Sequence, residues 1–136
     1  MEFYQDREAK TLRPGLFDTE ARKDADHVEG IQSSQFRNYF HELRTLEARF
    51  DREAKSNSHI AFGKLVSQLE LLKAKLAYGQ RKNGPLQNAS GFVSLMNRLI
   101  DAGKKSPEDF EAMMQYLEAV LAYFYAKEGQ NQGGRR

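Results

Sequence analysis

Apolar residues recur every three or four positions along most of the chain after residue 33. This period is typical of amphipathic α-helices, which turn one apolar stripe toward a core. Four such stripes follow one another, and they begin at Phe36, Phe62, Phe92 and Phe110. No stretch alternates convincingly between apolar and polar residues, as a half-buried strand does. The pattern predicts an all-α protein, a compact bundle of four main helices joined by short loops.

Residues that cap or break helices lie between the stripes. The fourth helix has a clear start signal, because Ser106 can cap it, Pro107 suits its first position and two acidic residues follow. The stretch KSNSH interrupts the pattern between the first and second stripes. These signals predict helices over about 34–54, 58–81 and 90–103, and a fourth from residue 107 onward.

The two ends of the chain lack this pattern. Residues 1–32 hold few apolar groups, and we interpret them as an N-terminal arm, mobile alone and able to dock on the bundle or on a partner. Within the arm, Asp18 or Thr19 can cap a short fifth helix that Gly30 ends. The helical bundle then spans residues 33–129. The polar, glycine-rich residues 130–136 are predicted to be a disordered tail.

Composition narrows the class of protein. A chain of 136 residues is expected to form one domain. Because it has no cysteine, a disulfide framework, a thiolate zinc site and a cysteine nucleophile are excluded, and the chain fits a reducing compartment. No segment approaches the roughly 20 apolar residues that span a membrane. We expect a cytoplasmic protein without a membrane partner.

Positive charge gathers in the middle of the chain. Residues 1–30 carry 5 basic and 8 acidic side chains, a net charge of −3, and residues 83–136 carry 6 of each. Residues 31–82 carry 10 basic and 5 acidic side chains, a net charge of +5. This asymmetry points to an anionic partner for the first two helices.

On a helical wheel these basic residues form two rails, one on each of the first two helices. They are Lys64, Lys75 and Lys82 on the second helix, and Arg37, Arg44 and Lys55 on the first, with His41 at the margin. If the two helices are antiparallel neighbours, the rails flank one groove that suits a polyanion. The alternative interpretation is a solvated surface with stabilising charge pairs.

Lys73 differs from the rails, because it projects into the core sector about 40° from Leu69. A long lysine side chain in such a position can extend to the surface. Two roles remain open at this point: an ion pair with an acid such as Glu118, or contact with a phosphate at the groove rim.

Extra apolar residues lie beside two of the core stripes. Leu71 and Tyr78 share a line on the second helix, and Tyr116 and Tyr123 share one on the fourth. Because additional apolar surface often marks a partner contact, we predict that these four residues form a protein interface. The alternatives are that the N-terminal arm or the third helix covers them, or that the tyrosines stack on bases.

The sequence gives little indication of a catalytic site. The three histidines, His27, His41 and His59, are scattered, and the common hydrolase, nucleotide-binding and metal-site motifs are missing. The acidic residues after Ser106 lie at a helix start, where the helix dipole favours them. We expect a protein that is not an enzyme and has no cofactor and no metal site.

Three stretches, taken together, resemble a known family. They are SQFRNYFHEL at 34–43, LLKAKLAYGQRK at 71–82 and FEAMMQYLEAVLAYFYAKEG at 110–129. In this order and at this spacing they are similar to the small helical subunit of the type III-A CRISPR effector, the Csm complex. The resemblance covers roughly residues 33–129.

The resemblance implies a non-catalytic, RNA-binding structural subunit in antiviral defence. Such subunits stack as a filament of several copies, opposite the CRISPR backbone subunits, along the channel where target RNA pairs with guide RNA. The large subunit is a further implied partner. The implied contacts are to the RNA backbone, while base pairing reads the sequence. The family motifs suggest four RNA-binding residues, Arg37, Lys73, Lys75 and Arg81. Arg44, Lys64 and Lys82 are added by the rails alone.

Two other classes remain open: a helical protein–protein scaffold and a DNA-binding regulator. A regulator requires a recognition helix, for which the short third helix with Asn97 and Arg98 is a poor candidate. A scaffold would leave the rails as solvated faces.

Overall fold

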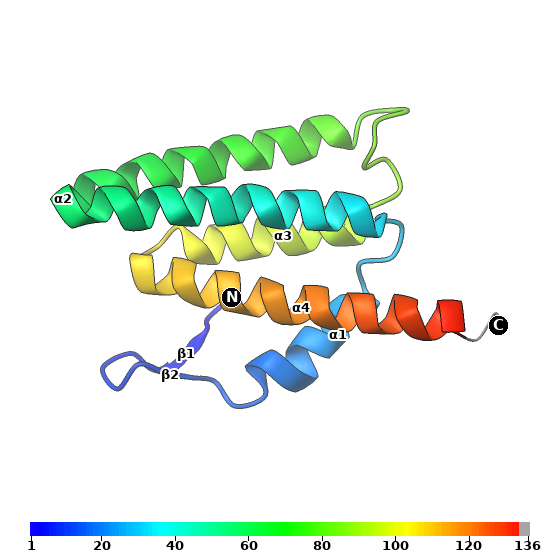
Figure 1. Ribbon diagram of the computed structural model, residues 1–136, viewed down its shortest axis with the longest axis horizontal. Helices are drawn as coiled ribbons and strands as arrows, with labels where there is room; N and C mark the ends of the chain where they lie inside the picture. Colours follow the sequence, from blue (N-terminus) through cyan, green and yellow to red (C-terminus); the bar gives the residue numbers. More distant parts are fainter. Residues whose placement is uncertain (134–136) are drawn as a thin grey trace.

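The computed structural model describes residues 1–133, with side chains through residue 129, and confirms the all-α fold class (Figure 1). The elements are β1 (Tyr4–Asp6), β2 (Thr11–Leu12), a π-helix η1 (Leu16–Glu20), α1 (Ala21–Asp26), α2 (Ser33–Gly79), α3 (Ser90–Gly103) and α4 (Pro107–Gly133). The antiparallel pair of β1 and β2 is an addition that the periodicity did not indicate. It is too short and too polar to show alternation.

Helix α2 is a helical hairpin. Asn57 alone leaves the helical conformation, with φ −157° and ψ 102°, and divides α2 into a first arm, 33–56, and a second arm, 58–79. The side-chain oxygen of Asn57 accepts a hydrogen bond from the Ile60 amide at 3.0 Å, which caps the second arm. The two arms run antiparallel and side by side (Figure 1). The predicted break within KSNSH is therefore confirmed.

The core lies between the two arms of α2, α3 and α4. The ring of Phe36 lies 5.0 Å from that of Phe92 and 5.3 Å from that of Phe124, measured between ring centroids. Gly103 ends α3 as predicted, and a Cβ there would lie 2.5 Å from the Met113 sulfur, so a larger residue would force the Met113 side chain to move. Each of the predicted stripes therefore contributes buried side chains to one shared core.

The N-terminal arm is packed into this core. Phe3, Leu16 and Val28 are each at most 1% exposed, although Leu16 lies in the short η1 and the other two lie just outside β1 and α1. Gly30 has a φ of +88°, and a Cβ there would lie 1.8 Å from the backbone oxygen of Asn88, so only glycine fits this approach. At the other end, α4 continues through Gly133, four residues into the predicted tail, and residues 134–136 of that tail lie outside the described part.

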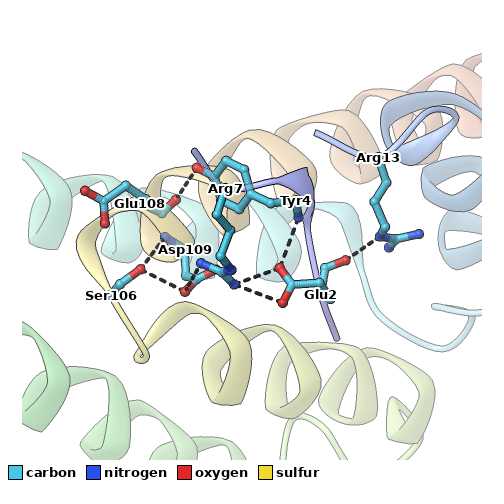
Figure 2. A network of polar contacts seen from close by, with 7 residues as sticks. All are labelled: Glu2, Tyr4, Arg7, Arg13, Ser106, Glu108 and Asp109. Atoms are coloured by element: carbon cyan, nitrogen blue, oxygen red, sulfur yellow. Dashed lines mark hydrogen bonds and ion pairs between the residues drawn. The ribbon is translucent and has the colours of Figure 1, made fainter. Parts of the chain in front are cut away.

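A polar network ties the first strand to the start of α4 (Figure 2). Ser106 caps α4 as predicted, because its hydroxyl oxygen accepts a hydrogen bond from the Asp109 amide at 3.1 Å. The Asp109 carboxylate, 3% exposed, also accepts from the Arg7 guanidinium at 3.0 Å, and Arg7 pairs with Glu2 at 2.7 Å. Asp109 and Glu2 together raise the pKa of Arg7, and Arg7 lowers the pKa of Glu2. These charge-assisted bonds compensate for the burial of Asp109.

Candidate nucleic-acid interface

One line of exposed residues runs along the second arm of α2. Ile60, Lys64, Leu71, Lys75 and Tyr78 project within about 60° of one another over 18 residues, or roughly 27 Å of helix. We call these five residues the outer strip. Ile60, Leu71 and Tyr78 are 54%, 49% and 67% exposed, and they are three of the four large hydrophobic residues exposed among residues 1–129. The strip therefore alternates cationic and apolar groups on one open helix face.

The two lysines of the outer strip form ion pairs with the first arm. The Lys75 ammonium lies 2.9 Å from a Glu42 carboxylate oxygen, and the Lys64 ammonium lies 3.7 Å from Glu53. The side chains of Lys75 and Lys64 remain 54% and 66% exposed. Exposed pairs of this kind contribute little to stability. Each ammonium can therefore exchange its carboxylate for a phosphate at small cost.

Two further cations follow the end of the strip. The second arm ends at Gly79, two residues earlier than predicted, because the chain turns back and the Leu86 amide bonds to the Gly79 carbonyl at 2.8 Å. Lys82 therefore lies in the loop after the helix and not on the helical line. The Arg81 guanidinium lies 3.8 Å from the centroid of the Tyr78 ring and donates to the Tyr78 carbonyl at 2.9 Å. Arg81 is thereby held against the end of the outer strip.

Arg44 of the first arm does not face the second arm, so the prediction that the two rails flank one groove is wrong for this residue. The Arg44 guanidinium pairs with Glu47 at 2.8 Å and with Glu118 of α4 at 3.1 Å. Those two carboxylates raise the pKa of Arg44, with Glu47 as the larger cause. Glu42, which contacts Lys75, lies two positions earlier and so about 200° around the helix. Arg44 lies between the first arm and α4, whereas Arg37 is exposed and makes no ion pair with residues 1–129.

Lys73 is held by an acid of α3 and not by Glu118. Its ammonium lies 2.7 Å from an Asp101 carboxylate oxygen, and the lysine side chain is 33% exposed. The hydrogen bond from Lys73 lowers the pKa of Asp101. Of the two roles that the sequence left open, the geometry matches an ion pair between the hairpin and α3.

The N-terminal arm covers the two tyrosines of α4, and their prediction as an exposed interface is wrong for Tyr116. Its side chain is completely buried, and its hydroxyl donates a short hydrogen bond to Asp24 of α1. Tyr123 is half-buried, and its hydroxyl donates to the Phe17 carbonyl at 3.1 Å. The Arg22 guanidinium lies 4.7 Å from the centroid of the Tyr123 ring. Of the predicted interface residues, only Leu71 and Tyr78 are open.

Two hollows that the sequence did not indicate meet at the base of the hairpin. Each measures about 300 Å³, and they share Gln35 and Pro85. One also includes Lys75 and Tyr39, so it adjoins the outer strip. We call the two together the amide groove, after six of the side chains that line them: Gln32, Gln35, Asn38, Asn83, Gln87 and Asn88. Four of these lie in loops or just before a helix, where periodicity carries no signal.

A larger hollow of about 430 Å³ lies between the arms near Asn57. Its lining includes Phe50 and Leu65, and Arg49 and Lys64 add positive charge. Arg49 makes no ion pair with residues 1–129 and was not singled out from the sequence. Ile60 was missed as well, although its spacing from Lys64 places it on the same helix line.

The histidines of the described residues do not form a cluster. His27, His41 and His59 are all exposed; His27 lies in the turn after α1, and His41 and His59 lie on different arms of α2. Among residues 1–129, no three histidine, aspartate or glutamate side chains are close enough to hold a metal ion. No helix in the described range is long and apolar enough to cross a membrane.

Comparison with known proteins finds a match to one family model. The family model described as Csm2 Type III-A matches residues 12–130. The match therefore begins at β2 and includes α1, well before the residues that carry the resemblance in the sequence. No curated protein and no solved structure shows a significant match to the chain.

Proposed function

The chain belongs to the Csm2 family, whose members are small structural subunits of the type III-A CRISPR Csm complex, and we propose that it is a non-catalytic subunit that contacts the sugar–phosphate backbone of RNA. The bound RNA is the target strand and the duplex that it forms with the guide. The protein surface that contacts this RNA is the outer strip together with Arg81 and Lys82. In this role the protein acts in antiviral defence in the cytoplasm, and base pairing between guide and target supplies the sequence specificity.

The observation that carries the proposal is the spacing of exposed cations along one face. Lys64 and Lys75 lie 11 residues apart, or about 16 Å along the helix. Arg81 and Lys82 extend the row at its end, and both are exposed. Ammonium and guanidinium groups placed in a row contact phosphates at intervals along a strand without reading bases. Such contacts suit a subunit that must accept any target sequence.

The apolar residues of the strip support contact with a neighbouring subunit. Leu71 and Tyr78 lie on the same line as the lysines, so a neighbour that covers them lies beside the RNA. In our proposal this neighbour is another copy of the chain or a backbone or large subunit of the complex. A contact between unlike surfaces of successive copies extends into a filament.

A direct experiment measures RNA affinity of the full chain by fluorescence anisotropy over a range of salt concentrations. With about 4 phosphates neutralised, log K should fall with log salt at a slope near −3, at about 0.7 per phosphate on a single strand. Lys75→Gln/Lys82→Gln should reduce the slope by about 1.4. The matched control is Lys23→Gln/Lys105→Gln, two exposed lysines of other segments, and it should keep the native slope. A slope near zero in the native chain would contradict the proposal.

A protein–protein scaffold is the second candidate, and one observation favours it. Three large apolar side chains, Ile60, Leu71 and Tyr78, are exposed on the strip, which is more than an RNA backbone requires. A scaffold predicts that the same anisotropy titration finds no RNA binding, while Leu71→Ala/Tyr78→Ala still lowers incorporation into the complex. RNA binding with the expected slope would set this alternative aside.

A further inference from the structure

The amide groove carries almost no net charge. In the hollow next to the outer strip, the charged lining groups are Lys75 and Glu42, and they pair with each other at 2.9 Å. The lining side chains of the other hollow are neutral. The groove therefore offers hydrogen bonds with little attraction for phosphate, in contrast to the cations of the strip.

Several amides of the groove have free hydrogen-bonding capacity. A side-chain amide has two N–H donors and an oxygen that accepts two hydrogen bonds. The side chains of Gln32, Asn38 and Asn88 make no hydrogen bond to any residue within 1–129. Gln35 uses one donor, toward the Pro85 carbonyl at 3.2 Å, and its side-chain oxygen has no partner within that range. A ligand with hydroxyl groups can therefore bind without displacing a protein contact.

The loop that forms one wall of the groove is held in place. Leu86 is fully buried against Gly79, where a Cβ would lie 2.8 Å from a Leu86 methyl carbon. The Gln87 side-chain oxygen accepts a hydrogen bond from the Asn83 backbone N–H at 3.0 Å. A wall that is fixed before binding loses little conformational entropy when a ligand is bound.

We propose that the amide groove binds ribose 2′-hydroxyl groups of the RNA strand held on the outer strip, and so selects RNA over DNA. The inference rests on the proposed function, because the strip must first bring the strand to the groove. Lys75 belongs to both surfaces, so a phosphate bound there places the adjoining sugar at the groove. The 2′-hydroxyl is both donor and acceptor, which matches an amide, and it is the group that distinguishes RNA from DNA.

The test compares three labelled 12-nucleotide strands of one sequence made only of adenine and cytosine, so that the bases are identical. The strands are RNA, DNA and 2′-O-methyl RNA, and binding to the full chain is measured by anisotropy. The native chain should bind RNA about fivefold more tightly than DNA, which corresponds to roughly 1 kcal/mol. The 2′-O-methyl strand should bind like DNA, because methylation removes the hydroxyl donor.

The diagnostic variant is Gln32→Met/Asn38→Leu, which removes two exposed amides while keeping side-chain size. Its RNA-to-DNA ratio should fall to about one, with the native salt slope on RNA, which also shows that the strip is intact. The control Gln5→Met/Gln115→Met changes two exposed amides elsewhere and should keep the native ratio.

Three outcomes would overturn the inference. Equal affinity of the native chain for RNA and DNA, with the expected salt slope, removes it and leaves the proposed function standing. A native ratio retained by the groove variant also removes it, and leaves the groove as a contact for a protein partner. Failure of every strand to bind removes both this inference and the proposed function.

Discussion

The N-terminal segment, residues 1–31, and the α2 hairpin use their apolar residues in opposite ways. The segment consists of two short strands and two short helices, yet Phe3, Leu16 and Val28 are almost completely buried. The hairpin is the longest element, yet it leaves Leu71 49% and Tyr78 67% exposed. The length of an element therefore does not indicate how much of it serves the core of this protein.

The two regions also differ in what their charges contact. The acids of the segment pair with later helices: Asp24 lies 3.0 Å from Arg98 of α3, and Asp26 lies 3.4 Å from Lys127 of α4. The three lysines of the second arm also form ion pairs, Lys64 and Lys75 with acids of the first arm and Lys73 with Asp101 of α3. The Asp24 side chain is 17% exposed and is held within the fold, whereas the Lys64 and Lys75 side chains remain more than half exposed and can reach a partner. A weakly patterned region can thus be structural while a strongly helical one carries the interface.

The sharpest test of this contrast compares one aromatic truncation in each region. Phe3→Ala should lower the free energy of unfolding by about 3–5 kcal/mol, because it opens a cavity under a fully buried ring. Chemical denaturation of the full chain measures this loss. Tyr78→Ala is the matched change on the hairpin, and it should cost no more than about 0.5 kcal/mol. Similar losses for the two variants would remove the contrast.

A second test measures how the ionisation of Tyr116, which the N-terminal segment covers, changes stability with pH. Burial, together with the hydrogen bond to Asp24, raises the pKa of Tyr116 above its ordinary value of 10.0. A raised folded-state pKa means that this stability is fully present below the unfolded-state pKa and is lost as the pH rises above it. The free energy of unfolding should fall by up to about 1.4 kcal/mol per pH unit above roughly pH 10.

Thermal or urea unfolding between pH 8 and pH 11 measures this slope, and Tyr116→Phe is its control. The variant has no phenol to ionise, so the part of the alkaline loss that Tyr116 causes should disappear. An identical alkaline loss in both proteins would show that Tyr116 is not sealed by the N-terminal segment.

A smaller effect is expected at two glycines of the second arm. Gly63 is helical, and a Cβ there meets no atom within 4 Å, so Gly63→Ala should stabilise the free protein by about 0.5–1 kcal/mol. Gly79→Ala should instead destabilise it, because the new Cβ would lie 2.8 Å from Leu86. Denaturation midpoints distinguish the two signs. Destabilisation by Gly63→Ala would indicate that the hairpin face is packed.

The smallest change in stability is expected for the outer strip itself. Leu71→Ala/Tyr78→Ala should alter the free energy of unfolding by no more than about 0.5 kcal/mol per site, because both side chains are already exposed. The same variant should incorporate less well when it is co-expressed with the other Csm subunits. Normal incorporation would leave these two residues without a role in assembly.

Local sequence signals were enough to predict where the main helices start, end or break. The Ser106 cap, the end of α3 at Gly103 and the break at Asn57 depend on a few adjacent residues, and all three were predictable. The alignment of Lys64, Leu71, Lys75 and Tyr78 follows from the helical repeat alone, so one sequence sufficed to place them on a common line. The short strands escaped prediction because two or three residues cannot display a period.

Contacts between helices could not be predicted from local sequence signals. The sequence alone establishes that Lys73 and Arg44 are long cations near an apolar stripe, but their partners depend on which helices become neighbours. The structure pairs Lys73 with Asp101 and turns Arg44 toward α4. The sequence also establishes that Tyr116 lies off the core stripe of its own helix. Only the tertiary structure decides that α1 covers it, because burial depends on segments some 90 residues away that a local pattern does not report.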